Sequence, residues 1–139
     1  MLVRENMFPP LLEADPTFLP KWREFLTEWS DESDDLPLYL ALDELAHHLV
    51  ETQQAGSISN LPKVFDVVER WHVEGDAYVS EAATIGLLES IQNILISKKA
   101  SKGKAGLDFT PYFGLETRRW WDKLYRFWDG DTSALKLDR

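Results

Sequence analysis

The sequence predicts an all-α fold of about five main helices, arranged as an antiparallel bundle or as a stack of helical hairpins. Apolar residues recur at steps of three and four positions through successive segments, which is the period of an amphipathic helix. No segment sustains the two-residue alternation of a strand, and the breaks between segments are short. We expect one domain over residues 1–139, with a core from about 10 to 130 between a flexible Pro-rich N-terminal segment and a loosely held C-terminal tail.

Four prolines punctuate the first twenty residues and leave room for at most a short turn around residues 11–14. The first main helix is predicted over residues 17–30, where Pro20 is tolerated because it stands in the first turn. Its apolar face consists of Phe18, Trp22, Phe25, Leu26 and Trp29.

Two further helices are predicted over residues 37–54 and 61–73. Gly56 is a C-terminal cap candidate for the former, and Asn60 is an N-cap candidate for the latter. The expected core positions are Leu38, Leu42, Leu45, Ala46 and Leu49 in the first of these helices, and Leu61, Val64, Phe65, Val68 and Trp71 in the second.

The most apolar segment, residues 76–98, predicts a central helix that begins at the capping residue Asp76. A loop at 101–106 and an extended aromatic segment, DFTPYFG, separate it from a last helix over 115–129. The Ala, Val, Ile and Leu residues of the central helix leave it with almost no polar side. A helix of this kind is normally surrounded by others.

The last helix has the sequence LETRRWWDKLYRFW, with five aromatic residues. A stacking platform for nucleic acid would leave such rings open on a basic surface. Here the rings share one stripe led by Trp120, Leu124 and Trp128, so we expect the helix to pack on the core, with Trp121 and Tyr125 nearest the surface. The opposite side carries Arg118, Arg119, Asp122, Lys123 and Arg126.

The formal net charge is −9, from 24 acidic and 15 basic residues. A chain that replaces phosphate counterions needs an excess of cations, so we do not expect nucleic-acid binding. There is no cysteine, which excludes disulfides, thiol nucleophiles and thiolate metal ligands. No apolar run reaches the length of a membrane span, and no signal-peptide core is present at the start. These features predict a cytoplasmic protein without a membrane partner.

A metal site is the enzymatic alternative. Glu44 with His47 and Glu69 with His72 are two Glu-x-x-His pairs, the motif of di-iron carboxylate bundles, in which glutamates such as Glu28 and either Glu81 or Glu89 would complete the ligand set. The helical period opposes this assignment, because it turns the first pair away from the apolar stripe while His72 lies on the stripe of its own helix. We therefore expect no metal or other cofactor.

The densest charge in the chain falls in and around SDESDD at residues 30–35. Such a run is commonly only a solvated loop. Its functional interpretation is an electrostatic docking surface for a basic protein, extended by carboxylates on the outer face of the next helix. The candidate partner-binding residues are Glu28, Asp31, Glu32, Asp34, Asp35, Asp43, Glu44 and Glu51.

Three stretches, LPLYLALDELAHHLVE, VFDVVERWHVEGDAYVSEAATIGLLESIQN and FTPYFGLETRRWWDKLYRFW, resemble a family of small, acidic, helical bacterial proteins of unknown function, which is associated with immunity proteins of toxin systems. The resemblance covers about residues 10–130. Its stretch EAATIGLLESIQN is similar to the inner helix of a HEAT-like hairpin, which implies a short helical stack. The resemblance implies a scaffold that binds another protein, and it carries no catalytic residue.

No nucleophile elbow, Cys/His pair or phosphate-binding loop is present, so we do not expect an enzyme. The favoured hypothesis is a protein-binding module, specifically an immunity protein that occludes the active site of a basic toxin domain. Two alternatives remain open. One is a helical metal-binding protein or enzyme that uses the two Glu-x-x-His pairs, and the other is a regulatory or structural subunit of a larger assembly.

Overall fold

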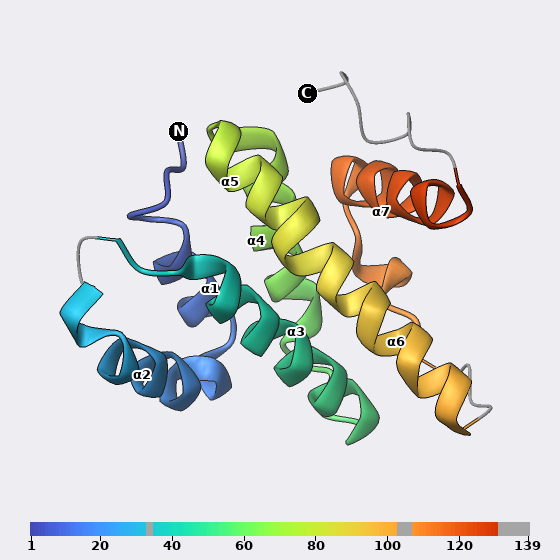
Figure 1. The fold of residues 1–139 in the computed structure, drawn as a ribbon, viewed down its shortest axis with the longest axis horizontal. Coiled ribbons are helices and arrows are strands. Elements are labelled where there is room, and N and C mark those ends of the chain that lie inside the picture. Colours follow the sequence, from blue (N-terminus) through green and yellow to red (C-terminus); the bar gives the residue numbers. More distant parts are fainter. Residues whose placement is uncertain (33–34, 103–106, 131–139) are drawn as a thin grey trace.

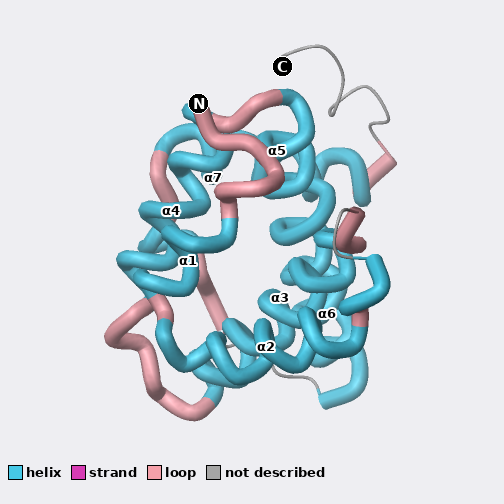
Figure 2. The backbone as a smooth tube through the Cα atoms, turned by 90° about the vertical axis from the view of Figure 1, so that its left-hand side faces the viewer, coloured by secondary structure: helices cyan, strands magenta, loops and turns pink. Residues whose placement is uncertain are grey.

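The computed structural model describes residues 1–32, 35–102 and 107–130, with residues 32 and 99–102 described by their backbone only. Within these ranges the chain is helical and forms no strand; a single bridge joins Leu2 to Gly75. Figure 2 shows helices along most of the described path, with short loops between them. The all-α prediction is confirmed. The predicted C-terminal tail beyond Gly130 lies outside the described residues.

The chain becomes helical earlier than the prolines suggested. Helix α1 spans Phe8–Ala14, where only a turn was predicted, because Pro9 and Pro10 stand in its first turn and need no amide hydrogen bond there. Met7 and Phe8 are buried, and the indole of Trp71 donates a hydrogen bond to the carbonyl of Met7 at 2.9 Å. The core therefore starts before residue 10.

The next three helices confirm the predicted elements within a few residues. A 3₁₀ turn leads into α2 at Leu19–Glu28, followed by α3 at Leu38–Gln54 and α4 at Leu61–Glu74. All apolar positions predicted for α3 and α4 are buried, and Gly56 has the positive φ of 78° expected of a C-terminal cap. Asn60 occupies the N-cap position of α4 as predicted, but its side chain makes no capping hydrogen bond and donates to the carboxylate of Asp15 instead.

The segment predicted as one central helix is α5 at Ala77–Glu81, a π-helical stretch at Ala82–Leu88 and α6 at Glu89–Lys102. It crosses the molecule as one rod with α3 on one side and α7 on the other (Figure 1) and contacts α3, α4 and α7. Asp76 caps its start by accepting the Val79 amide proton at 2.9 Å, as predicted. In the described parts of the chain, no helix combines the length and the apolarity that crossing a membrane requires.

The last helix, α7, spans Leu115–Trp128 and buries Trp120 and Leu124 as predicted. Trp121, which was expected near the surface, is only 5% exposed because the ring of Phe113 packs edge-on against it at 5.1 Å. Trp128 is 41% exposed because it stands in the last turn, at the end of the helix.

The prediction that Lys123 is exposed on α7 was also wrong. Lys123 was placed on the outer side of the helix, yet it is only 8% exposed. Its ammonium group lies 5.2 Å from the centre of the Trp120 ring, a cation–π arrangement in which the methylene stem covers apolar surface. On the outer side, where both residues were predicted, Arg118 and Asp122 form an ion pair at 3.3 Å.

Candidate functional site

The net charge of −9 originates in one part of the chain. Residues 24–62 contain nine acidic residues and no Lys or Arg, whereas the remaining 15 acidic residues are balanced by all 15 basic ones. This stretch runs from the middle of α2 through α3 to the start of α4, and we call it the acidic segment. A field of one sign over a limited part of the surface favours encounter with a partner of the opposite sign.

The predicted partner-binding residues are exposed wherever the structure describes their side chains. These residues are Glu28, Asp31, Asp35, Asp43, Glu44 and Glu51. Asp34 lies outside the described residues, and Glu32 is described by its backbone only. The arrangement on α3 follows from its period, because burying Leu42, Leu45 and Leu49 on the inner face turns the intervening carboxylates to solvent.

Three of these carboxylates have a Lys, Arg or His side chain within 4 Å. The pairs are Asp35 with Arg4 at 3.4 Å, Glu51 with Lys21 at 3.6 Å and Asp43 with His47 at 3.8 Å. The carboxylate of each pair is largely open to water, so the attraction within the pair is weak and the carboxylate is available to a stronger partner. Glu28, Asp31 and Glu44 form no ion pair with another described residue.

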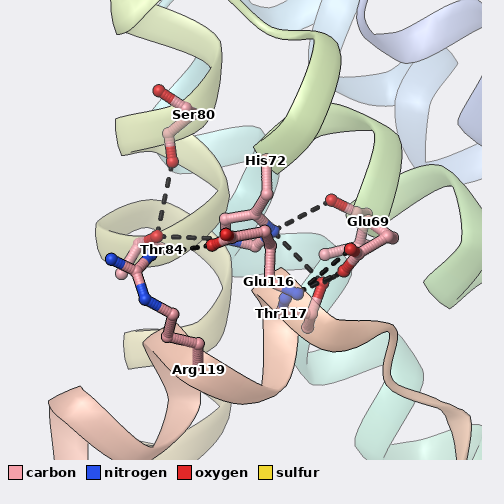
Figure 3. Close-up of polar contacts among 8 residues, drawn as sticks. Glu69, His72, Ser80, Thr84, Glu116, Thr117 and Arg119 are labelled. Atoms are coloured by element: carbon pink, nitrogen blue, oxygen red, sulfur yellow. Dashed lines mark hydrogen bonds and ion pairs between the residues drawn. The ribbon is translucent and has the colours of Figure 1, made fainter. Parts of the chain in front are cut away.

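A different group of predicted residues, Glu69 and His72, lies in a polar cluster between α4, the π-helical stretch and α7 (Figure 3). The Nδ1 atom of His72 lies 3.0 Å from the carbonyl oxygen of Val68 and 3.2 Å from the hydroxyl of Thr117. Its Nε2 atom lies 3.0 Å from the hydroxyl of Thr84. Both ring nitrogens have partners and both threonines are fully buried, which confirms the interpretation of His72 as a satisfied, partly buried histidine.

Glu69 serves as the N-terminal cap of α7 from outside that helix. Its Oε1 atom accepts the amide proton of Thr117 at 2.8 Å, and its Oε2 atom accepts that of Glu116 at 3.0 Å. Gly114 precedes α7 because a Cβ atom there would lie 2.4 Å from the Glu69 Cδ atom. Burial alone would raise the pKa of Glu69, but these hydrogen bonds and the nearby His72 charge leave the pKa below its usual value.

The structure does not bring the two Glu-x-x-His pairs together. Glu44 and His47 face solvent on α3, whereas Glu69 and His72 hold α7 to α4. Of the remaining proposed ligands, Glu28 and Glu81 are exposed and Glu89 is half-buried, and burial raises the pKa of Glu89. Among the described residues, no group of three or more His, Cys, Asp or Glu side chains is placed to hold a metal ion.

A second polar cluster was not foreseen from the sequence. Asp15 and His48 are buried, with side chains 3% and 8% exposed, and the Nε2 atom of His48 lies 3.0 Å from the Asp15 carboxylate. The Thr17 hydroxyl donates to the same carboxylate and lies 3.0 Å from His48, and Asn60 donates to it at 3.2 Å. The helical period places His48 inward beside Leu45, but only the tertiary fold brings Asp15 to it. The cluster joins the chain before α2 to α3 and to the start of α4.

A pocket of about 270 Å³ opens between α1, α2 and the start of α3. Its apolar wall consists of Phe8, Pro9, Leu12, Trp22, Leu36 and Leu38. The rings of Phe8 and Trp22 are stacked with centroids 4.3 Å apart. Arg4 and Glu5 provide the charged part of the lining. Leu36 and Leu38 belong to the acidic segment, so the pocket and the acidic segment are continuous.

The chain was compared with protein families, with curated proteins and with solved structures. A family model described as "Domain of unknown function (DUF7674)" matches residues 8–129, which is most of the chain. No curated protein and no solved structure matches.

Proposed function

The chain belongs to the DUF7674 family of domains of unknown function, and we propose that it is a protein-binding module, most concretely an immunity protein that neutralises a bacterial toxin. In this proposal it acts in the cytoplasm, binds a basic toxin domain through the acidic segment and covers the active site or substrate groove of that domain. If the toxin is a nuclease, the carboxylates take the place of the phosphates of its substrate.

The observation that carries this proposal is the origin of the charge. The whole net charge of −9 arises from residues 24–62, and all six of the predicted carboxylates with described side chains are exposed. Surface charges that only keep a protein soluble do not require the acidic residues to lie in a different part of the chain from the basic ones. Complementary fields speed the encounter of two proteins and discriminate against partners with the same sign of charge.

The proposal gives a structural role to the two histidine clusters. In both clusters the carboxylate and the histidine already have hydrogen-bonding partners within the protein. A catalytic acid or base must reach a proton of its substrate, whereas these groups hold helices together. The exposed, weakly paired carboxylates are therefore the groups available to a partner.

The test of this function is protection of a living cell. A candidate toxin domain, taken from the genes adjacent to that of this chain, is expressed from an inducible promoter, with the chain or an empty plasmid in the same cell. We expect the chain to restore growth and to elute with the purified toxin domain as a stoichiometric complex. Loss of growth in the presence of the folded chain, together with separate elution, would contradict the proposal.

A further inference from the structure

We propose that the pocket between α1, α2 and the start of α3 receives a bulky apolar side chain of the protein partner, next to a Lys or Arg that pairs with Glu5. This inference rests on the proposed function and names a contact within it. The occupant is a short basic segment of the partner, with one apolar residue as its anchor.

The size and lining of the pocket favour a single side chain. Pockets for small-molecule ligands usually enclose about 300–1,000 Å³, and this one encloses about 270 Å³. Phe8 is buried at its base, whereas Leu12 and Trp22 are half-buried. Binding sites between proteins concentrate their free energy where a large apolar residue enters such a desolvated pocket.

The charged residues at the pocket indicate which type of residue should stand next to the apolar anchor in the partner's segment. The guanidinium of Arg4 donates to the carbonyl of Leu36 at 2.7 Å and lies 3.4 Å from the Asp35 carboxylate, so Arg4 already has partners within the chain. Glu5 is exposed and has no ion pair with another described residue. Arg4, Glu5 and Asp35 together carry one net negative charge. This charge favours a Lys or Arg of the partner beside the apolar anchor residue.

Three peptides serve as probes: acetyl-Gly-Lys-Trp-Lys-Gly-amide, its Glu-Trp-Glu analogue and its Lys-Ala-Lys analogue. Each is titrated into the full-length ¹⁵N-labelled chain while amide chemical shifts are followed. We expect the Lys-Trp-Lys peptide to shift the amides of Glu5, Leu12 and Leu36 saturably. The other two peptides should bind these sites at least about fivefold more weakly, because each lacks the anchor or the matching charge.

Substitutions in the pocket, each with a matched substitution elsewhere on the surface, test whether the peptide binds in the pocket. Leu12→Trp fills the pocket and should abolish the saturable shifts, whereas Val73→Trp places the same ring on an exposed part of α4 and should not. Glu5→Gln keeps the surface folded and should weaken binding by about two- to fivefold, whereas Glu81→Gln on α5 should leave it unchanged.

The proposal is overturned if the Lys-Trp-Lys peptide produces no saturable shift at these amides, or if either analogue binds as tightly. It is also overturned if the pocket holds a second copy of the chain, seen as a dimer in sedimentation that Leu12→Trp dissociates. If the peptides do not bind the pocket but reversing the charge of the acidic segment still slows toxin binding, only the pocket proposal is contradicted, and the proposed function is retained. Conversely, peptide binding in a chain that neither protects cells nor binds the toxin would contradict the proposed function alone.

Discussion

Glu69 of α4 caps the N-terminus of α7, with its Oε1 atom 2.8 Å from the amide nitrogen of Thr117. The same oxygen accepts the Thr117 hydroxyl at 2.8 Å, and this hydroxyl lies 3.2 Å from His72. A helix end usually takes its cap from the residue that precedes it, but here that residue is Gly114, which has no side chain. The last helix is therefore fixed by a carboxylate 48 residues earlier in the chain.

The close approach of Gly114 to Glu69 predicts a coupling between these two positions. Gly114→Ala should lower the free energy of unfolding by about 1–3 kcal/mol, because its Cβ atom would meet the carboxylate. Glu69→Ala should cost about 1–2 kcal/mol through loss of the cap. In the double variant the added methyl group has no carboxylate to meet. The loss of unfolding free energy in the double variant should therefore be smaller than the sum of the losses in the two single variants. Urea unfolding of the four proteins measures this, and strictly additive losses would refute the contact.

The lowered pKa of Glu69 predicts a specific response to acid. A carboxylate whose pKa is depressed in the folded state contributes stability above its unfolded pKa, and this contribution is lost as the pH falls through the folded value. The wild-type chain should therefore lose stability below pH 4.5 faster than Glu69→Gln does. Thermal unfolding measured from pH 7 to pH 3 compares the two proteins. Parallel pH profiles would show that the hydrogen bonds from the Glu116 and Thr117 amides do not stabilise the ionised carboxylate of Glu69.

Gln92 should be required for the docking of the end of α7. It is fully buried on α6, donates to the carbonyl of Trp121 at 3.0 Å and accepts the indole proton of Trp128 at 3.0 Å. Gln92→Leu keeps a similar volume but leaves both groups without a partner, so we expect a loss of about 1–3 kcal/mol in urea unfolding. Trp128→Phe removes the indole donor and one ring but keeps the hydrogen bond from Gln92 to Trp121, so it should cost less. Equal stability of wild type and Gln92→Leu would show that neither hydrogen bond matters.

Two Asp–His pairs differ in burial and provide a matched comparison. Asp15→Ala leaves the buried ring of His48 without its carboxylate partner and should lower stability by about 1–3 kcal/mol. Asp43→Ala removes the exposed partner of His47 and should leave stability almost unchanged. Thermal or urea unfolding of both variants at neutral pH measures the difference. If the two substitutions proved equally mild, the buried cluster would not hold α3 to the preceding chain.

The main helices from α2 onward could be predicted because they carry local signals in the sequence, whereas α1 was missed. The apolar positions of α3 and α4 follow the helical period and are buried, and the cap signals at Gly56 and Asp76 hold in the structure. Periodicity also predicted correctly that Glu44 faces solvent and that His72 is partly buried. These properties depend on residues close to one another in the chain.

The features that sequence reasoning missed depend on contacts between distant residues. Asn60 bonds to Asp15 rather than to its own helix, and Trp121 is buried because Phe113 reaches it. The π-helical stretch at 82–88 carries no turn signal; Thr84 within it bonds to His72 of α4, and a Cβ atom at Gly86 would meet Leu42 of α3. A local pattern does not encode which neighbour a side chain will meet after folding.

The most direct test of the proposed function is the rate at which the chain associates with a candidate toxin domain that it protects cells against. The variant Asp31→Lys/Asp43→Lys/Glu44→Lys reverses three exposed charges of the acidic segment, and Glu13→Lys/Asp66→Lys/Glu81→Lys reverses three exposed charges elsewhere. Stopped-flow association at low and high salt, on proteins with matching circular dichroism spectra, compares them with wild type. We predict that the first variant associates about tenfold or more slowly at low salt and loses most of its salt dependence, whereas the second changes little. Equal association rates for the two variants would contradict the assignment of the acidic segment as the partner-binding surface.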